Sequence, residues 1–275
     1  MQDLSARYPV WLCDVWGVVH NGIRSFPAAL TALASHRRNG GTVVLLTNAP
    51  RPAGMVEVFL TKLAVTREHF DLVVTSGDVT RDLIARHAGG RIHYLGPARD
   101  HGLIEGLGVE IGNAENSEII LCVGLRDDAT ETAEDYRGEL ARLRDRGLAM
   151  ICANPDLVVR RGDRLIPCAG AIAFLYEEMG GTVIMAGKPF RPIYELAIRA
   201  VANLRGAPPA MRDLLAIGDG PDTDVKGAAD FGVDILLIQG GISESDTGLA
   251  EFEREVKARI RGARIVRALP FLNWS

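Results

Sequence analysis

Val10-Trp11-Leu12-Cys13-Asp14 is the stretch that decides the fold, because it is a short apolar run that ends in an aspartate. A second run of the same kind, Leu214-Leu215-Ala216-Ile217, is followed by Gly218-Asp219-Gly220-Pro221-Asp222-Thr223-Asp224. Each run is typical of a buried strand, and each places carboxylates where the strand meets a Gly-containing turn. If the two strands lie together in one sheet, their acidic ends are able to hold a hard cation such as Mg²⁺.

Strand-like and helix-like segments alternate along most of the chain around these two runs. Apolar runs at 42–47 and 71–76 are typical of strands, and helices are expected over 27–38, 53–63 and 192–204. This alternation predicts an α/β fold with a mostly parallel sheet. Near-continuous Val and Leu runs of this kind suit strands that are buried on both faces.

The segment from about 82 to 183 differs in texture and predicts a second α/β unit inserted into the first. It holds strand-like runs at 91–95, 118–122 and 149–152, and helix-like segments at 132–146 and 169–179. Two further runs, 158–160 and 164–166, flank Arg161-Gly162-Asp163 and indicate a hairpin. The predicted domains are a core formed by 1–80 and 184–275 and an inserted domain formed by 81–183.

Composition describes an ordinary globular protein and excludes several classes of partner. The chain has 275 residues, of which 47% are hydrophobic and 24% charged, with a net charge of −4. No basic field argues for nucleic acid or a membrane surface. The N-terminus lacks an apolar signal core, and no apolar stretch approaches the roughly 20 residues of a membrane span. The 4 cysteines form no CxxC pair, so a reduced, cytoplasmic enzyme is expected.

Four polar signals stand at or just beyond predicted strand ends, the edge at which open parallel sheets bind ligands. They are Asp14, Thr47-Asn48, Lys188 and the pair Asp219 and Asp224. A carboxylate is able to attack phosphorus, a Thr hydroxyl to hold phosphoryl oxygens, a lysine to neutralise charge, and two acidic residues to complete a Mg²⁺ shell. Each signal also has a plainer interpretation, as a turn former, a helix cap, a strand exit or a surface lysine. Their order and placement on one alternating chain favour the chemical interpretation.

Together these motifs resemble the haloacid dehalogenase superfamily, and specifically its class IIA phosphatases, which are NagD-like or p-nitrophenyl phosphatase-like. The matching residues are Asp14 at its strand end, Thr47-Asn48, Gly187-Lys188-Pro189, and Gly218-Asp219 with Thr223-Asp224. The resemblance covers essentially the whole chain, since an insert of about 100 residues stands where the family has its cap. It implies a Rossmann-like core with an inserted α/β cap of the C2 type.

The resemblance also implies a role for each matching residue. Asp14 would be the nucleophile, Lys188 would orient it and screen its charge, and Thr47 would bind phosphoryl oxygens with help from the Asn48 backbone. The implied Mg²⁺ ligands are the carboxylates of Asp14, Asp219 and Asp224 and the main-chain carbonyl of Trp16. The implied partner is a small phosphorylated substrate, and a homodimer is a further expectation because class IIA relatives often pair through the cap.

The residue two positions after the predicted nucleophile departs from the family pattern. Family phosphatases carry a second aspartate there, which protonates the leaving oxygen and then activates water, whereas this chain has Trp16. An indole N–H exchanges no proton at neutral pH, so Trp16 is unable to do this work and is instead a candidate wall of the substrate pocket. Superfamily dehalogenases also have an aromatic residue here, but their chemistry needs no metal, and Asp219 and Asp224 would repel each other without a cation.

Three interpretations of Trp16 stay open. In the first, another group has taken over proton transfer, and His20 is the nearest titratable candidate, although it also suits a plain turn position. In the second, the substrate has a good leaving group, such as an acyl phosphate. In the third, the chain is a weakly active or inactive binder of a phosphorylated ligand, or a phosphotransferase.

Two loops of the inserted segment predict residues that contact the substrate. Ala153-Asn154-Pro155-Asp156 resembles the Thr-Asn-x-Asp turn of the family, and Pro167-Cys168-Ala169-Gly170 stands where a Pro-Gly-x-Gly loop is usual. Asn154, Asp156 and Gly170 are therefore candidate pocket residues, with ordinary turn chemistry as the alternative. The sequence as a whole predicts a Mg²⁺-dependent phosphohydrolase for a sugar phosphate, a nucleotide monophosphate or a similar metabolite, working through an aspartyl-phosphate.

Overall fold

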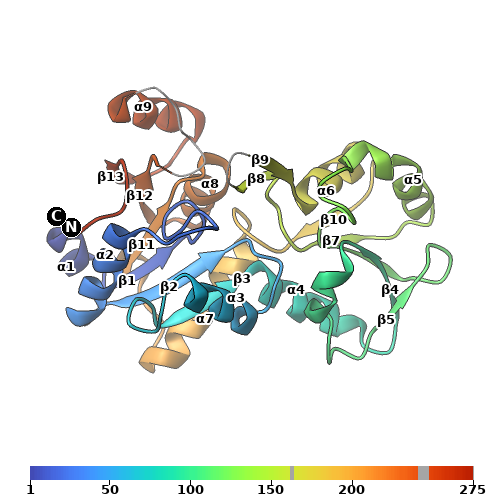
Figure 1. Ribbon diagram of the computed structural model, residues 1–275, viewed down its shortest axis with the longest axis horizontal. Helices are drawn as coiled ribbons and strands as arrows, with labels where there is room; N and C mark the ends of the chain where they lie inside the picture. The colour runs from blue at the N-terminus through green and yellow to red at the C-terminus, as the bar shows by residue number, and fades with distance from the viewer. Residues whose placement is uncertain (162–163, 241–247, 275) are drawn as a thin grey trace. The chain divides into compact units, whose positions relative to one another are not determined.

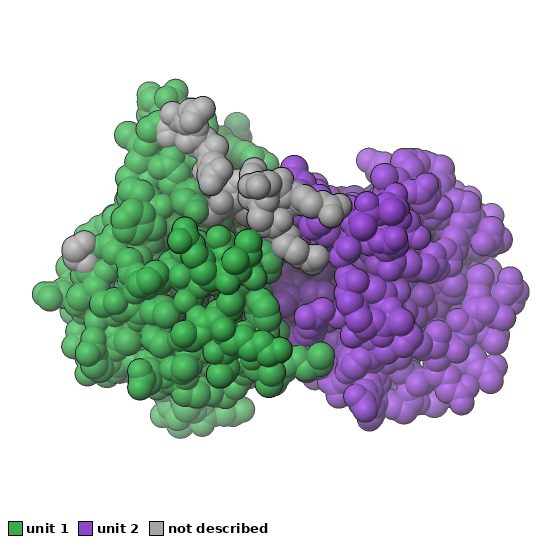
Figure 2. Space-filling view, in the orientation of Figure 1, with its two compact units in different colours: residues 1–47, 54–74, 188–275 green, residues 48–53, 75–187 purple. Residues whose placement is uncertain are grey.

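The structure is a computed structural model that describes residues 1–161, 164–240 and 248–274. By spatial contact the chain divides into two compact units, which Figure 2 shows in green and purple. Unit 1 comprises Met1–Thr47, Gly54–Val74 and Lys188–Ser275, and unit 2 comprises Asn48–Ala53 and Thr75–Gly187. The sequence-based domain boundaries at 80/81 and 183/184 stay a prediction.

Unit 1 is built, within the described residues, on a six-stranded sheet in the order β13-β12-β11-β1-β2-β3 (Figure 1). Its strands are β1 (Val10–Cys13), β2 (Thr42–Thr47), β3 (Leu72–Thr75), β11 (Leu214–Gly218), β12 (Asp234–Ile238) and β13 (Ile265–Leu269). The pairs β1–β2, β1–β11, β11–β12 and β12–β13 are all parallel. Every residue of β1 and β2 is buried, as expected for central strands covered on both faces.

Helices follow the strands of unit 1 in the alternating order that the sequence predicts. They are α1 (Gln2–Arg7), α2 (Pro27–Arg38), α3 (Ala53–Lys62), α7 (Arg191–Arg205), α8 (Lys226–Phe231) and α9 (Leu249–Arg259). Both α2 and α7 pack against β2. Pro192 stands in the first turn of α7, and Gly206 ends this helix in the left-handed region at φ +79°, where glycine carries no steric penalty.

The order of the strands reverses at β1, and this reversal positions the candidate site. The chain adds β2 on one side of β1 and returns with β11 on the other side, so the carboxyl ends of β1 and β11 are neighbours. Cys13 pairs with Ile217, and the Asp14 N–H donates to the Ile217 carbonyl at 2.8 Å. Ligands of open α/β sheets bind at such a switch point.

Unit 2 has its own sheet, which in the described part of the chain has five parallel strands in the order β10-β7-β6-β4-β5. These strands are β4 (Arg91–Leu95), β5 (Glu110–Gly112), β6 (Ile119–Cys122), β7 (Met150–Cys152) and β10 (Val183–Met185). Its helices are α4 (Ser76–Ile84), α5 (Arg137–Asp145) and α6 (Ala169–Glu178), with 3₁₀ turns η1 (Ala85–His87), η2 (Ala98–Leu103) and η3 (Ala133–Tyr136). The predicted hairpin pairs β8 (Val158–Arg161) with β9 (Arg164–Pro167) antiparallel, and its turn lies outside the described residues.

Alternation along the central strands of unit 2 builds two separate cores. Ile120 and Cys122 of β6 enter one core together with residues of α5 and α6. Ile119 and Leu121 of the same strand enter the other, with Ile84 of α4. Because side chains alternate across a sheet, the two cores lie on opposite faces, and unit 2 is an α/β layer structure in its own right.

The predicted α/β fold with mostly parallel sheets is therefore confirmed. The sequence missed β5 and β13, which stand at the edges of their sheets and have no fully buried residue. The helix predicted over 132–146 begins as the 3₁₀ turn η3 before α5. Within the described residues, no helix is both long enough and apolar enough to cross a membrane.

Candidate active site

A cluster of buried carboxylates lies at the switch point of unit 1. Asp14 directly follows β1, Asp219 directly follows β11, and Asp224 lies in the π-helical turn η5 (Pro221–Val225) that precedes α8. Each of the three offers an oxygen, and these oxygens lie within 4.8 Å of one another. The predicted convergence of the two acidic strand ends is thus present in the structure.

Two glycines give the Asp224 carboxylate its place. A Cβ at Gly218 would lie 2.2 Å from Cγ of Asp224, so a larger residue there would displace the carboxylate. The Gly220 N–H donates to Oδ2 of Asp224 at 3.1 Å. The Gly-Asp-Gly sequence around Asp219 is therefore required by the close approach of the turn that follows it.

Lys188 lies among these carboxylates and is only 3% exposed. Its Nζ donates to Oδ1 of Asp14 at 2.5 Å and to Oδ1 of Asp224 at 2.7 Å. Burial alone would lower the Lys188 pKa, but the Asp14 and Asp224 carboxylates outweigh it and raise that pKa well above its usual value. Burial, with the negative charge of Asp224 next in importance, raises the pKa of Asp14 well above its usual value. We call Asp14, Lys188, Asp219 and Asp224 the charged cluster.

The charged cluster suits a divalent cation. Lys188 pairs with Asp14 and Asp224, and Asp219 adds a third carboxylate oxygen close to theirs in a place from which water is largely excluded. Buried charges in proteins are paired or coordinate metals. The donors are oxygens, as Mg²⁺ prefers, and they come from few side chains, which leaves coordination positions for water and a phosphate. The predicted contribution of the Trp16 carbonyl stays a prediction.

The loop after Asp14 packs around a buried histidine. His20 is 2% exposed, its ring meets Trp16 edge-on at 5.3 Å and Phe59 at 5.6 Å, and its Nδ1 accepts from the Gly22 N–H at 2.9 Å. Burial lowers the His20 pKa to about 4, so the ring is neutral at pH 7. A neutral, enclosed imidazole suits packing of the loop better than acid catalysis, and the predicted catalytic role of His20 stays a prediction that this geometry does not favour.

The half-buried indole of Trp16 is fixed by this same loop. Gly22 has φ +84°, and a Cβ there would lie 2.4 Å from Cη2 of Trp16. The ring therefore rests on the bare backbone of a glycine on one side and meets His20 on the other. Such a fixed ring suits the predicted wall of a pocket, a role that stays a prediction.

The remaining predicted substrate residues gather in unit 2, except Thr47, which is buried at the end of β2 in unit 1. Nδ2 of Asn48 donates to Oδ1 of Asp156 at 2.8 Å, and the Asp156 N–H donates to Oδ1 of Asn154 at 3.0 Å. A Cβ at Gly170 would lie 2.3 Å from the Pro155 carbonyl oxygen, so this glycine packs directly on the turn. We call Asn48, Asn154, Asp156 and Gly170 the polar cluster.

Comparison with known proteins agrees with this geometry. Residues 11–110 match the family model of haloacid dehalogenase-like hydrolases, and residues 185–268 match a second model described as HAD-hydrolase-like. The crystal structure of a hydrolase of the haloacid dehalogenase-like family from Brucella suis 1330 is 47% identical, with a TM-score of 0.88 over 99% of this chain and 98% of that one.

Two curated relatives are more distant. The 5′-nucleotidase YutF of Bacillus subtilis is 22% identical over 253 residues, covering 91% of this chain and 94% of the relative. The acid sugar phosphatase of Staphylococcus aureus strain USA300 is 28% identical over 240 residues, covering 86% and 88%. With the fold, the switch-point carboxylates and these matches together, the chain belongs to the haloacid dehalogenase-like family of hydrolases.

Proposed function

We propose that the chain is a Mg²⁺-dependent phosphohydrolase that acts on a small phosphorylated metabolite through an aspartyl-phosphate on Asp14. The observation that carries this proposal is the charged cluster, in which a buried carboxylate with a lysine partner stands beside two further acidic oxygens. Carboxylates form covalent phosphoryl intermediates in this kind of setting. The names of the relatives, a nucleotidase and a sugar phosphatase, support a nucleotide monophosphate or a sugar phosphate as substrate.

The residues of the chain divide the work of the proposed reaction. An Asp14 oxygen attacks phosphorus, the bond from phosphorus to the leaving oxygen breaks, and water then attacks the phosphorus of the intermediate, which frees Asp14 and releases phosphate. Lys188 holds Asp14 through Oδ1 and offsets charge on the transferring group. The Thr47 hydroxyl and the Asn48 main chain hold phosphoryl oxygens. The Asn48 side chain is given no part in this, because its Nδ2 donates to Asp156. The carboxylates of Asp14, Asp219 and Asp224 and the Trp16 carbonyl would hold Mg²⁺, which would supply Lewis-acid stabilisation of the phosphoryl oxygens.

Trp16 and His20 narrow the substrate further. Between residues 15 and 25, His20 is the only side chain that titrates near neutral pH in ordinary surroundings, and its pKa is lowered to about 4 by burial. Leaving groups that depart without a proton, such as those of acyl and aryl phosphates, therefore suit this loop best. The same observation favours a second candidate function, a phosphotransferase or a binder of phosphorylated ligands with little turnover.

The test is phosphate release from a panel of alkyl, aryl and acyl phosphates, with Mg²⁺ and with EDTA. We expect release that requires Mg²⁺ and falls by at least about 10³-fold in Asp14→Asn, because this isosteric change removes the nucleophile. Far-UV circular dichroism of the variant controls for folding. Equal release by Asp14→Asn and the wild type would reject the proposed intermediate, and phosphate binding without any turnover would favour the binder.

A further inference from the structure

The loop 48–53 belongs to a different unit from the strand that leads into it. β2 ends at Thr47 in unit 1, the next six residues cluster with unit 2, and the chain returns to unit 1 at Gly54. The peptide bond between Thr47 and Asn48 therefore joins two proposed phosphate contacts that are held by different units. The contacts that hold the loop 48–53 in unit 2 therefore also hold the main chain of Asn48 in place.

The loop is fastened to unit 2 along its whole length. At its start, Asn48 donates to Asp156 at 2.8 Å, and a Cβ at Gly187 would lie 2.4 Å from the Asn48 Oδ1 atom. In its middle, the Ala49 carbonyl accepts from the Gly77 N–H at 3.2 Å, and at its end the Ala53 N–H donates to Oδ1 of Asp78 at 3.1 Å. Asp156 thus holds the start of the loop, and the first turn of α4 holds its middle and its end.

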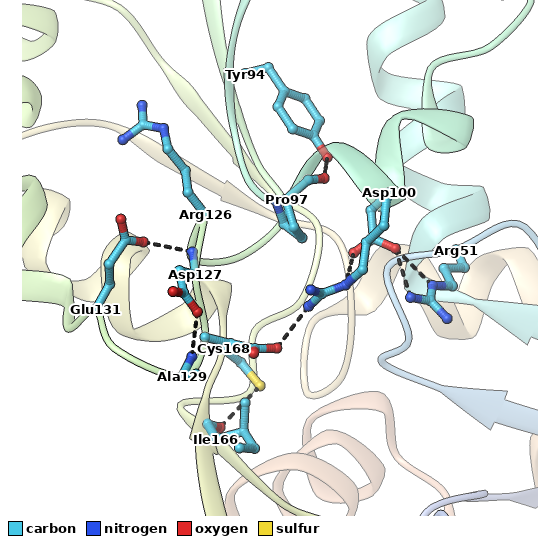
Figure 3. Close-up of polar contacts among 12 residues, drawn as sticks. Arg51, Tyr94, Pro97, Asp100, Arg126, Asp127, Ala129, Glu131, Ile166 and Cys168 are labelled. Carbon is cyan, nitrogen blue, oxygen red and sulfur yellow. Dashed lines mark hydrogen bonds and ion pairs between the residues drawn. The ribbon is translucent and has the colours of Figure 1, made fainter.

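An ion pair between Arg51 and Asp100 adds to these contacts, and Figure 3 shows it with its dashed lines. Nε and Nη2 of Arg51 lie 2.9 Å and 2.8 Å from Oδ1 of Asp100. The Asp100 side chain is only 8% exposed, and its other oxygen lies 3.9 Å from Nε of Arg99. Charge-assisted contacts of this kind are stronger than neutral ones, and removal of one partner leaves a largely buried carboxylate poorly paired.

The backbone of unit 2 is shaped to receive Arg51. A Cβ at Gly77 would lie 2.4 Å from the carbonyl carbon of Arg51, so only glycine lets α4 approach the loop this closely. Asp78 beside it closes the capping box of α4 with Thr75 and also accepts from Ala53. The start of α4 and the loop are therefore one packed structure.

We propose that Arg51 is a positioning residue for phosphoryl binding: through Asp100 it holds the loop 48–53 on unit 2 in the conformation that presents the Asn48 main chain beside Thr47. The proposal rests on the proposed function, since it assumes that these two residues contact the phosphoryl group. Order imposed on the loop before the ligand arrives does not have to be created on binding, so it raises affinity. Arg51 itself touches neither the substrate nor the charged cluster in this scheme.

The test compares Arg51→Met with Arg126→Met in the full-length protein. Arg126 is a matched control, since its side chain is 45% exposed against 43% for Arg51 and it also pairs with a carboxylate of unit 2, Glu139, at 2.7 Å. Calorimetric titration with inorganic phosphate in Mg²⁺ should show about tenfold weaker binding in Arg51→Met, which corresponds to 1.4 kcal/mol, and less than twofold in the control. For a hydrolysed ester, KM should rise by a similar factor while kcat changes less than threefold, and Arg51→Lys should recover part of the loss.

Amide hydrogen exchange separates this proposal from the proposed function. In Arg51→Met the amides of 48–53 should exchange faster, while those of 10–14 should keep the wild-type rate. If the wild type neither binds nor releases phosphate, the proposed function fails. Separately, unchanged exchange in 48–53 of Arg51→Met would show that the Arg51–Asp100 ion pair does not hold the loop. Phosphate affinity that is equal in Arg51→Met and Arg126→Met would overturn the positioning role even where exchange rises.

Discussion

The charged cluster of unit 1 and the polar cluster of unit 2 are held together by different forces. In the charged cluster, three buried carboxylates offer oxygens within 4.8 Å of one another, and two of these carboxylates pair with Lys188. In the polar cluster, two asparagine side chains are hydrogen-bonded to Asp156, and Gly170 packs on main chain. The difference shows two ways of building a site: one cluster gathers buried acidic oxygens that could bind a metal, whereas the other is joined by hydrogen bonds and close packing.

Removal of Mg²⁺ should have the largest effect on stability and turnover, and this effect should depend on the charged cluster alone. At 100 times its Kd, Mg²⁺ should stabilise the protein by about 2.7 kcal/mol through mass action, and EDTA should reverse the gain. Asp219→Asn should abolish the gain in thermal midpoint and lower turnover by at least about 10³-fold, because it removes a ligand oxygen of the charged cluster. Asp156→Asn changes the polar cluster in the same chemical way and should keep the full Mg²⁺ response. A loss of that response in Asp156→Asn instead would contradict the division between the clusters.

Trp16→Asp should change the preference for the leaving group, because it adds a carboxyl group two residues after Asp14. A carboxyl at this position can protonate a poor leaving group, a contribution typically worth 10²-fold or more in rate, so kcat/KM for alkyl phosphates should rise about 10²-fold relative to aryl phosphates. Trp16→Phe keeps an apolar ring and should leave this ratio unchanged. A ratio that is the same in all three proteins would show that proton transfer to the leaving group comes from elsewhere.

Buried histidines of unit 1, which belong to neither cluster, should make the free energy of unfolding fall in acid. Burial lowers the pKa of His20 and of His36, which stacks on Trp11 at 3.8 Å, to about 4. Between pH 6.5 and about 4 the unfolded chain then binds more protons than the folded protein, so stability present above pH 6.5 is lost as the pH falls, by about 1.4 kcal/mol per unit of pKa shift.

Thermal midpoints measured from pH 7 to pH 4.5 in saturating Mg²⁺ should therefore decline less steeply in His20→Gln than in the wild type. His101→Gln, at an exposed position in unit 2, is the matched control and should leave the slope unchanged. An equal slope in all three proteins would mean that the buried ring of His20 is not a source of the acid sensitivity.

The sequence predicted the charged cluster because every member stands next to a strand or a glycine turn. Apolar runs ending at Asp14 and Asp219 are local signals, and the rule that parallel strands share their carboxyl edge turns them into a spatial prediction. The family resemblance then supplied Lys188, whose second partner, Asp224, emerged only from the structure. The α/β fold could be predicted for the same reason, since it rests on periodicity that each segment carries alone.

The contacts that fix the polar cluster and the loop could not be predicted in this way. Arg51 and Asp100 are 49 residues apart, and nothing in the local sequence of either marks an ion pair. The burial of His20 depends on Phe59 and on the close approach of Gly22, so its lowered basicity is a result of tertiary packing. The sequence therefore indicates which residues are able to carry chemistry, but not which of them form hydrogen bonds or ion pairs with one another in the folded protein.

The assignment of the loop 48–53 to unit 2 has a consequence for recombination between relatives. A chimera that exchanges only 75–187 would replace Asp100 and Asp156 while keeping Arg51 and Asn48, so each loop residue would face a foreign partner. Unit 2 is thus formed by two separate segments, Asn48–Ala53 and Thr75–Gly187. Exchange of unit 2 between relatives therefore requires both segments to come from the same parent, because only such a chimera keeps these contacts.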